Sequence, residues 1–318
     1  MPASLPLSEV DQVEILTVLD NSLDVLMAGS ETARRVALGG TVVGEGRSTL
    51  RAEHGFSVLV TVVKGGQREK FLLDAGLTKE SLIHNMDVLE IRPTDLHAIV
   101  LSHGHTDHVA GLMGLLSRIG RRRLPLLLHP DAFLQRKTVL PDGGEVLLPP
   151  PDRRGIEQEG VALVEERGAS MLLGGLALVT GQIARTTDFE KGFPVHYARI
   201  DGKWRPDPLI HDDQGVVMNV KDKGLVVLSG CGHAGIVNVL RHAMTQTGIA
   251  NVHAVLGGFH LTGRLFEPLI APTVRALKEI GPKLIVPSHC TGWKATHEIA
   301  RALPDAFVPN SVGTTFVI

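Results

Sequence analysis

Three histidines and an aspartate crowd into the six-residue segment HGHTDH, which begins at His103. The segment follows the apolar run at residues 98–101, so its polar side chains come where a buried strand is expected to end. In an extended chain, residues i and i+2 share a face, so His103 and His105 would point at one place. Asp107 and His108, at the following turn, could reach a second place nearby. Imidazoles and carboxylates together suit zinc, and also iron or manganese, so the segment predicts a metal site.

Short apolar runs separated by turns predict the elements that position this segment. Runs rich in Val, Ile and Leu, typical of buried strands, occur at residues 13–19, 57–63, 70–73, 98–101 and 125–128, and again at 176–180, 215–220, 225–229, 252–256 and 283–287. Helices are predicted over 108–119, 235–244, 266–280 and 293–303. Two sheet-rich halves with helices outside predict an α/β fold, a four-layer αββα sandwich.

We expect a single domain over residues 1–318, with a lid or insertion around 139–213. That segment contains a polar stretch rich in Pro and Gly, and long irregular loops inside compact domains are often functional. Phe193 and Trp204 lie in it and could form a flap over a site, although single exposed aromatic residues are ordinary.

Composition excludes several classes of protein. The net charge of −2 gives no general electrostatic reason to bind nucleic acid or a membrane surface. The two cysteines, Cys231 and Cys290, are too few for a disulfide scaffold. No apolar run approaches the length of a membrane span, and the N-terminus has no secretory pattern. We therefore expect a soluble cytoplasmic protein; the oligomeric state is not predicted.

The sequence resembles the metallo-β-lactamase superfamily, of which HGHTDH is the signature and LLDAG, with Asp74, the preceding motif. The resemblance continues through AEHGFSVLV, GLVVLSGCGHAGIVNV, VLGGFHL, IVPSHCTG and VPNSVGTTFVI, and these look like the branch named for 7,8-dihydropterin-6-methyl-4-(β-D-ribofuranosyl)-aminobenzene-5'-phosphate synthase. It implies two divalent metal ions, with zinc expected and iron or manganese as alternatives. The ligands it implies are His103 and His105 for one ion, Asp107 and His108 for the other, and His289 as the last histidine ligand. Asp74 would be the buried carboxylate that orients a ligand imidazole.

The sequence departs from the superfamily pattern in two places. The stretch VTGQIARTTDFE lacks the histidine of the usual Gly-His motif, and the strand at 225–229 ends in GCGH where a Gly-Asp pair is usual. We expect His233 to supply the missing imidazole and Cys231 to be a further ligand, because a thiolate binds zinc well. Asp213, in HDDQG, is a competing carboxylate near the site. Cys290 is expected to be a core residue.

Other residues could line a substrate pocket. Asp107 and His260 are the residues expected to take part in catalysis. His260 would be a proton donor or a phosphate contact, and the alternative is that it is a structural histidine of its loop. His54 could likewise face the site or be a structural histidine of its loop. Arg185 could grip an anionic small-molecule substrate through its guanidinium, or form a surface salt bridge.

Three functions remain open from the sequence. The first is a metal-dependent hydrolase that uses a metal-bound hydroxide on a phosphoester, lactone or thioester. The second, suggested by the branch, is a pterin synthase, which would need two organic substrates and release pyrophosphate. The third is a ligand-binding or regulatory protein with a degraded metal site.

Overall fold

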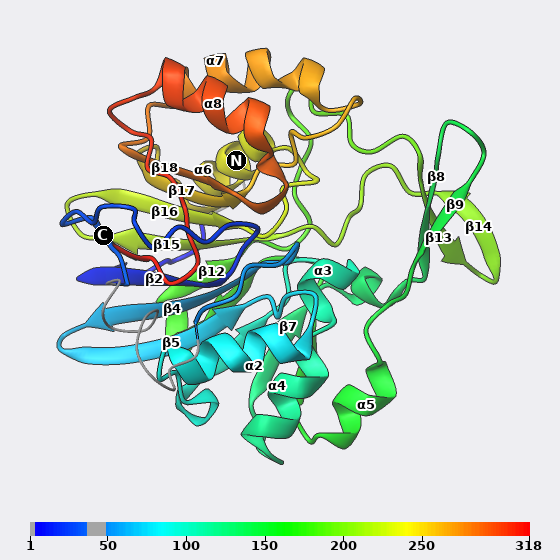
Figure 1. Ribbon diagram of the computed structural model, residues 1–318, viewed down its shortest axis with the longest axis horizontal. Coiled ribbons are helices and arrows are strands. Elements are labelled where there is room, and N and C mark those ends of the chain that lie inside the picture. The colour runs from blue at the N-terminus through cyan, green and yellow to red at the C-terminus, as the bar shows by residue number, and fades with distance from the viewer. Residues whose placement is uncertain (1–3, 37–48) are drawn as a thin grey trace.

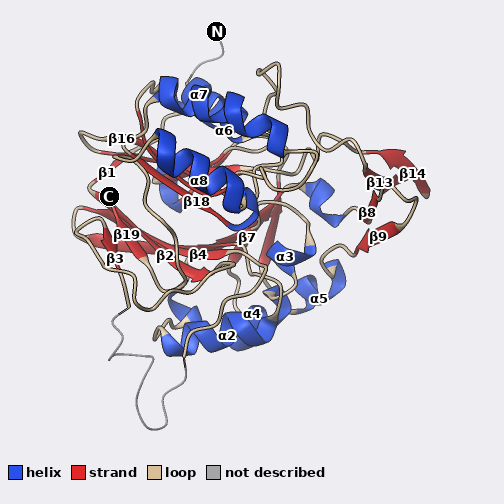
Figure 2. Ribbon diagram, turned by 45° about the horizontal axis from the view of Figure 1, so that its top comes forward, coloured by secondary structure: helices blue, strands red, loops and turns tan. Residues whose placement is uncertain are grey.

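The computed structural model describes residues 4–36 and 49–318. Two mixed sheets face each other and helices cover their outer faces, so the layers are helix, sheet, sheet, helix (Figures 1 and 2). We call the sheets upper and lower after their positions in Figure 1. This arrangement confirms the predicted αββα sandwich.

The lower sheet has the strand order β10-β7-β6-β5-β4-β2-β19-β3. Its strands are β2 (Gln12–Leu19), β3 (Ala33–Arg34), β4 (Ser57–Lys64), β5 (Gln67–Leu73), β6 (Ala98–Val100), β7 (Pro125–Leu128), β10 (Ala162–Glu165) and β19 (Thr315–Val317). The helices on its side are α2 (Lys79–Val88), α3 (Thr106–Val109), α4 (Leu112–Ile119) and α5 (Arg153–Gln158).

The upper sheet has the order β11-β12-β15-β16-β17-β18, with β1 paired to β15. Its strands are β1 (Glu9–Val10), β11 (Ser170–Leu172), β12 (Ala177–Val179), β15 (Gly215–Val220), β16 (Gly224–Ser229), β17 (Val252–Gly258) and β18 (Leu284–Ser288). The helices α6 (Ile236–Thr247), α7 (Ile270–Ile280) and α8 (Trp293–Ala302) cover it.

Apolar side chains fill all three interfaces between these layers. Val60 and Phe71 of the lower sheet share one cluster with Val216 of the upper sheet. A second cluster joins the upper sheet to α6, α7 and α8, and a third joins the lower sheet to α2 and α4. Because both faces of these strands are covered, β4 and β15 are buried almost along their whole length, as their continuous apolar runs predict.

The predicted helix at 108–119 is interrupted at Gly111, between α3 and α4. A Cβ atom at Gly111 would lie 2.1 Å from the carbonyl oxygen of Ala75, so only glycine allows the two backbones to approach here. The expected apolar face is present: Leu112, Leu115, Leu116 and Ile119 are all buried in α4. The helix predicted at 266–280 begins as a short 3₁₀ turn, Glu267–Leu269, before α7.

A third, four-stranded sheet stands away from the sandwich (Figure 1, right), and we call it the projecting sheet. Its order is β14-β13-β8-β9, with β8 (Arg136–Val139), β9 (Glu145–Leu148), β13 (His196–Ile200) and β14 (Lys203–Pro206). It is built from two stretches far apart in the chain. Between them, β10, β11 and β12 belong to the main sheets, so the segment 139–213 is not one continuous excursion.

The strand directions explain where a site can form. In the lower sheet β5, β6 and β7 are parallel neighbours, and in the upper sheet β16, β17 and β18 are parallel neighbours. The carboxyl ends of parallel strands open at one edge of a sheet, which is where α/β proteins place their ligands. Within the described residues, no helix is long and apolar enough to cross a bilayer.

Candidate metal centre

Most of the ligand-type residues predicted for the site follow the ends of these parallel strands. His103 comes after β6, Cys231 and His233 after β16, His260 after β17, and His289 after β18. The main chain there adopts unusual conformations: φ is 45° at His260 and 48° at His289, and also 62° at Asp74 after β5. Positive φ is uncommon for residues other than glycine and clusters at functional sites, so the fold holds this edge in a strained shape.

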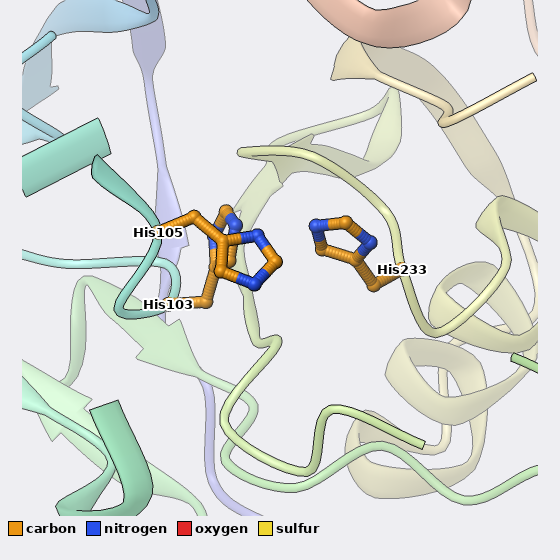
Figure 3. Close-up of side chains that lie close together, drawn as sticks. All are labelled: His103, His105 and His233. Atoms are coloured by element: carbon orange, nitrogen blue, oxygen red, sulfur yellow. The ribbon is translucent and has the colours of Figure 1, made fainter. Parts of the chain in front are cut away.

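His103, His105 and His233 form the first group of ligand-type side chains. One ring nitrogen from each lies within 4.8 Å of the others. Figure 3 shows His103 and His105 side by side, with His233 facing them from the other side of the gap. The Nε2 atom of His103 and both ring nitrogens of His233 are buried without any hydrogen-bond partner. Because buried polar atoms are almost always satisfied, these nitrogens fit the ligand positions of a metal ion.

A second group surrounds Asp107. Its Oδ2 atom lies 3.1 Å from Nε2 of His289, 3.8 Å from Nε2 of His108 and 3.7 Å from Nε2 of His54. The Nε2 atom of His108 is buried and has no hydrogen-bond partner. His103, His108 and Cys231 also bring their ligand atoms within 4.8 Å of one another, so the two groups adjoin.

Cys231 lies between the groups. Its sulfur lies 3.3 Å from Nδ1 of His260 and 3.0 Å from the sulfur of Cys290, and Cys231 shares further ligand-type groups with His233 and with His289. Burial raises the pKa of the Cys231 thiol well above its usual value. A positive ion beside it would favour the thiolate that metals bind. Cys290, expected in the core, is buried beside it.

The electrostatics favour neutral imidazoles at most of the candidate ligands, but at His108 the carboxylates of Asp74 and Asp107 outweigh burial and raise the pKa. Burial, reinforced by neighbouring histidines, lowers the pKa of His103, His105 and His233 well below the usual value. Burial likewise lowers the pKa of His289 to about 4. For Asp107, burial alone would raise the pKa, but the rings of His108 and His289 outweigh it and lower the pKa strongly. Neutral imidazoles and an ionised carboxylate are the forms that bind metal.

Asp74 holds the ring of His108. Its Oδ2 atom lies 2.6 Å from Nδ1 of His108, and its Oδ1 atom accepts a 2.7 Å hydrogen bond from the backbone N–H of Ser102. The opposite nitrogen, Nε2, is thereby turned toward the centre. Gly230 makes room for this pair, because a Cβ atom there would lie 2.1 Å from Oγ of Ser102 and 2.6 Å from Oδ2 of Asp74.

Asp213 supports the loop that carries His233. Its Oδ2 atom accepts a 2.7 Å hydrogen bond from the backbone N–H of Ala234, while its Oδ1 atom is buried without a partner. Burial raises the pKa of Asp213 to about 6. Asp213 belongs to none of the ligand-type groups found in residues 4–36 and 49–318.

The remaining predicted residues lie around this centre. His54 is exposed, with its ring 4.9 Å from that of His289. The ring of His260 lies 4.1 Å from that of His233 and 5.7 Å from that of Phe193. Arg185 is half-buried and donates to the carbonyl oxygens of Ile183 and Leu209. Trp204 lies in β14 of the projecting sheet, where Nζ of Lys137 stands 4.7 Å from its ring.

Two features were not predicted from the sequence. Nε2 of His196, the first residue of β13, lies 3.0 Å from Nε2 of His105. Arg136, in β8, donates to Asp212, which in turn accepts a 2.8 Å hydrogen bond from the backbone N–H of Gly104. His196 is a lone histidine in the segment FPVHYARI, with no second ligand-type residue at a regular spacing to indicate its role. Arg136 and Asp212 are 76 positions apart, so the sequence does not indicate that they form a pair.

Comparison with known proteins places these residues in a family. The family model described as the metallo-beta-lactamase superfamily matches residues 54–241. A relative from Methanocaldococcus jannaschii, named 7,8-dihydropterin-6-methyl-4-(beta-D-ribofuranosyl)-aminobenzene-5'-phosphate synthase, is 31% identical over 261 residues, which are 80% of this chain and 87% of the relative.

Two solved structures are similar over almost their whole length. Tm1679, described as a metal-dependent hydrolase of the beta-lactamase superfamily, has a TM-score of 0.72 and 25% identity, covering 96% of this chain and 98% of that one. The metallo-beta-lactamase fold protein YhfI from Bacillus subtilis has a TM-score of 0.50 and 11% identity, covering 97% of this chain and 100% of that one, and shows the fold alone. By fold, motif and family model, the chain belongs to the metallo-β-lactamase superfamily.

Proposed function

We propose that the protein is a metal-dependent hydrolase of a small, anionic phosphoester, lactone or thioester. The observation that carries this proposal is the set of buried ring nitrogens without partners on His103, His108 and His233. Leaving such atoms unsatisfied costs free energy, which a bound cation would offset. A binding protein that had lost its metals would have no need to keep them.

The residues divide into two neighbouring sets. His103, His105 and His233 would hold one ion, and Asp107, His108 and His289 would hold the other, with Cys231 next to both sets. Divalent ions held there would activate water for attack and polarise the bond under attack. We favour zinc, because imidazole, carboxylate and thiol together suit it, with iron or manganese as alternatives.

His260 would act as a hydrogen-bond donor to the substrate. Burial lowers the pKa of His260 to about 3, so the ring is neutral at physiological pH. In its Nε2–H tautomer the neutral ring can hold an anionic oxygen, so this role fits His260 better than that of a charged acid. His54, beside the open side of Asp107, would contact the substrate from the solvent side.

Arg185 is a weaker candidate for gripping the substrate. Burial lowers the pKa of Arg185, although Asp213 and Glu190 act in the opposite direction, and its two hydrogen bonds run to backbone carbonyls. Its guanidinium would therefore have to leave those partners to reach an anion. We assign Arg185 a role in supporting the loop that leads to Asp213.

A pterin synthase activity is the second candidate, because the relative of that name is 31% identical over 80% of this chain. The two reactions differ in what they consume. Hydrolysis requires one organic substrate and water, whereas the synthase reaction would join two organic substrates and release pyrophosphate. Pyrophosphate release that depends on both substrates would select the synthase.

The first test is metal content per chain by mass spectrometry, on protein purified without chelator and after reconstitution with zinc, manganese or iron. About two ions per chain support the proposal. His103→Ala should lower this number, whereas His84→Ala, on α2, should not. The loaded protein is then assayed with phosphodiesters, lactones and thioesters. No bound metal after reconstitution would overturn the hydrolase mechanism.

A further inference from the structure

His196 is a side chain of the projecting sheet that reaches the candidate metal centre. This residue begins β13 and is fully buried. Its Nε2 atom lies 3.0 Å from Nε2 of His105, and the two ring centres are 5.0 Å apart. A contact between two ring nitrogens at this distance requires one of them to carry a proton and the other to accept it.

The hydrogen-bond partner of the other ring nitrogen of His196, Nδ1, determines which nitrogen of this ring carries the proton. Its Nδ1 atom lies 3.1 Å from the backbone carbonyl oxygen of Asp207, and a carbonyl oxygen can only accept. Nδ1 of His196 therefore carries the proton, and in the neutral ring Nε2 is left as an acceptor. The proton between the two rings must then belong to Nε2 of His105, which leaves Nδ1 of His105 with a free lone pair.

The backbone around these two histidines is fixed by a buried charge network. Arg136 of β8 donates to Asp207 at 3.2 Å and to Asp212 at 2.5 Å. Asp212 accepts from the backbone N–H of Gly104, between the two histidines of the HGH segment. The same network thus holds both the carbonyl that orients His196 and the loop that carries His105.

We propose that His196 is a positioning residue that fixes the tautomer and orientation of His105, so that His105 presents Nδ1, and not Nε2, to the metal. The proton chain runs from Nε2–H of His105 to Nε2 of His196, and from Nδ1–H of His196 to the carbonyl of Asp207. Histidine ligands of metals usually donate their second N–H to a carboxylate or a carbonyl. Here the acceptor is a second imidazole, supplied by the projecting sheet.

Direct coordination by His196 is the competing geometry. Two imidazole ligands of one tetrahedral zinc would have their nitrogens about 3.3 Å apart, close to the distance observed. However, within the described residues His196 is not among the groups whose ligand atoms all lie within 4.8 Å of one another. Within residues 4–36 and 49–318, the hydrogen-bond partner of its Nε2 atom is His105, as expected for a positioning residue.

This inference rests on the proposed metal centre, and nuclear magnetic resonance of ¹⁵N-histidine-labelled protein loaded with zinc tests it. Long-range ¹H–¹⁵N correlations report which nitrogen of each ring carries a proton and which binds metal. We expect His105 to show a protonated Nε2 and a metal-bound Nδ1, and His196 to show a protonated Nδ1. A metal-bound Nε2 on either ring overturns the inference.

Variants of His196 give a second readout, zinc affinity measured by competition with a chelator. His196→Ala should weaken zinc binding about 10- to 100-fold, the usual effect of removing such a partner. His196→Gln, whose side-chain carbonyl can accept from His105, should recover part of this loss. His84→Ala is the matched control, because His84 also contacts a backbone carbonyl but lies on α2. Unchanged affinity in a folded His196→Ala protein overturns the inference.

The two levels of failure can be told apart. If the wild-type chain binds no metal, the proposed function fails together with the inference. If the wild-type chain binds metal but His105 binds through Nε2, or the His196 variants bind zinc as tightly as wild type, only the inference fails. Circular dichroism and thermal unfolding of the metal-free variants show whether a loss of affinity reflects a loss of fold.

Discussion

The sandwich edge and the projecting sheet contribute to the same centre in different ways. The sandwich edge supplies ligand-type side chains from loops that follow parallel strands, and their backbones are strained at Asp74, His260 and His289. The projecting sheet supplies His196, which contacts His105, and Arg136, which contacts Asp212 and through it the backbone of Gly104. The sandwich therefore provides the atoms that could bind metal, and we infer that the projecting sheet orients one of them.

Loss of a ligand from the sandwich edge should have the largest effect. His233→Ala should reduce the metal content from about two ions per chain to about one, because no other imidazole in its group replaces it. Asp213→Ala should leave the metal content unchanged, because Asp213 holds the backbone of Ala234 and is outside the ligand-type groups of the described residues. Metal analysis of both variants checks this, and the opposite pattern would make Asp213 the ligand.

Breaking the buried charge network of the projecting sheet should come next. Arg136→Met leaves Asp212, fully buried, without its counter-charge, which costs about 3–5 kcal/mol of unfolding free energy in comparable cases. Urea unfolding measures the loss. Arg118→Met, which removes an exposed pair with Asp87, is the control and should change stability little. An equal effect of the two substitutions would show that the projecting sheet is not anchored through Arg136.

The difference between the two regions also explains what the sequence could predict. The HGHTDH segment places four ligand-type side chains within six positions, and its place after an apolar strand fixes the edge of the sheet where they lie. His233 and His289 follow strands as well, so parallel strand order brings them to the same edge. Local pattern was therefore sufficient for the αββα sandwich and for bringing these side chains to one of its edges.

The contribution of the projecting sheet could not be predicted in this way. His196 meets His105 across 91 positions, and Arg136 meets Asp212 across 76. Neither contact follows from a period or from a strand end, since the projecting sheet is assembled from two stretches separated by strands of the main sheets. A buried arginine and a lone histidine in short strands look like surface residues until their partners are known.

A buried carboxyl at the sandwich edge, Asp20, should make stability depend on pH. Burial raises the pKa of Asp20 to about 6 from an ordinary 3.8, despite hydrogen bonds from the backbone N–H of His289 and from Asn310. A raised carboxyl pKa favours the folded state below pH 4, and this contribution is lost as the pH rises through 6. The loss amounts to about 3 kcal/mol.

Because Asp20→Asn cannot ionise, the unfolding free energy of this variant should rise by about 3 kcal/mol relative to that of the wild type between pH 4 and pH 7 in metal-free protein. Asp142→Asn, in an exposed loop, should leave the profile as it is in the wild type. A difference between Asp20→Asn and the wild type that stays constant from pH 4 to pH 7 would place the titrating group elsewhere.

The smallest expected effect concerns Asp74, which tests whether the orientation of a ligand imidazole matters at the sandwich edge as well. Asp74 contacts Nδ1 of His108 at 2.6 Å, just as His196, from the projecting sheet, contacts Nε2 of His105. Asp74→Asn keeps the size of the side chain but weakens this contact, so metal affinity should fall about 10- to 100-fold, or about 1.4–2.8 kcal/mol. Chelator competition measures it beside His196→Ala. Equal losses in the two variants would mean that both regions orient ligands, whereas a loss in Asp74→Asn alone would confine that task to the sandwich.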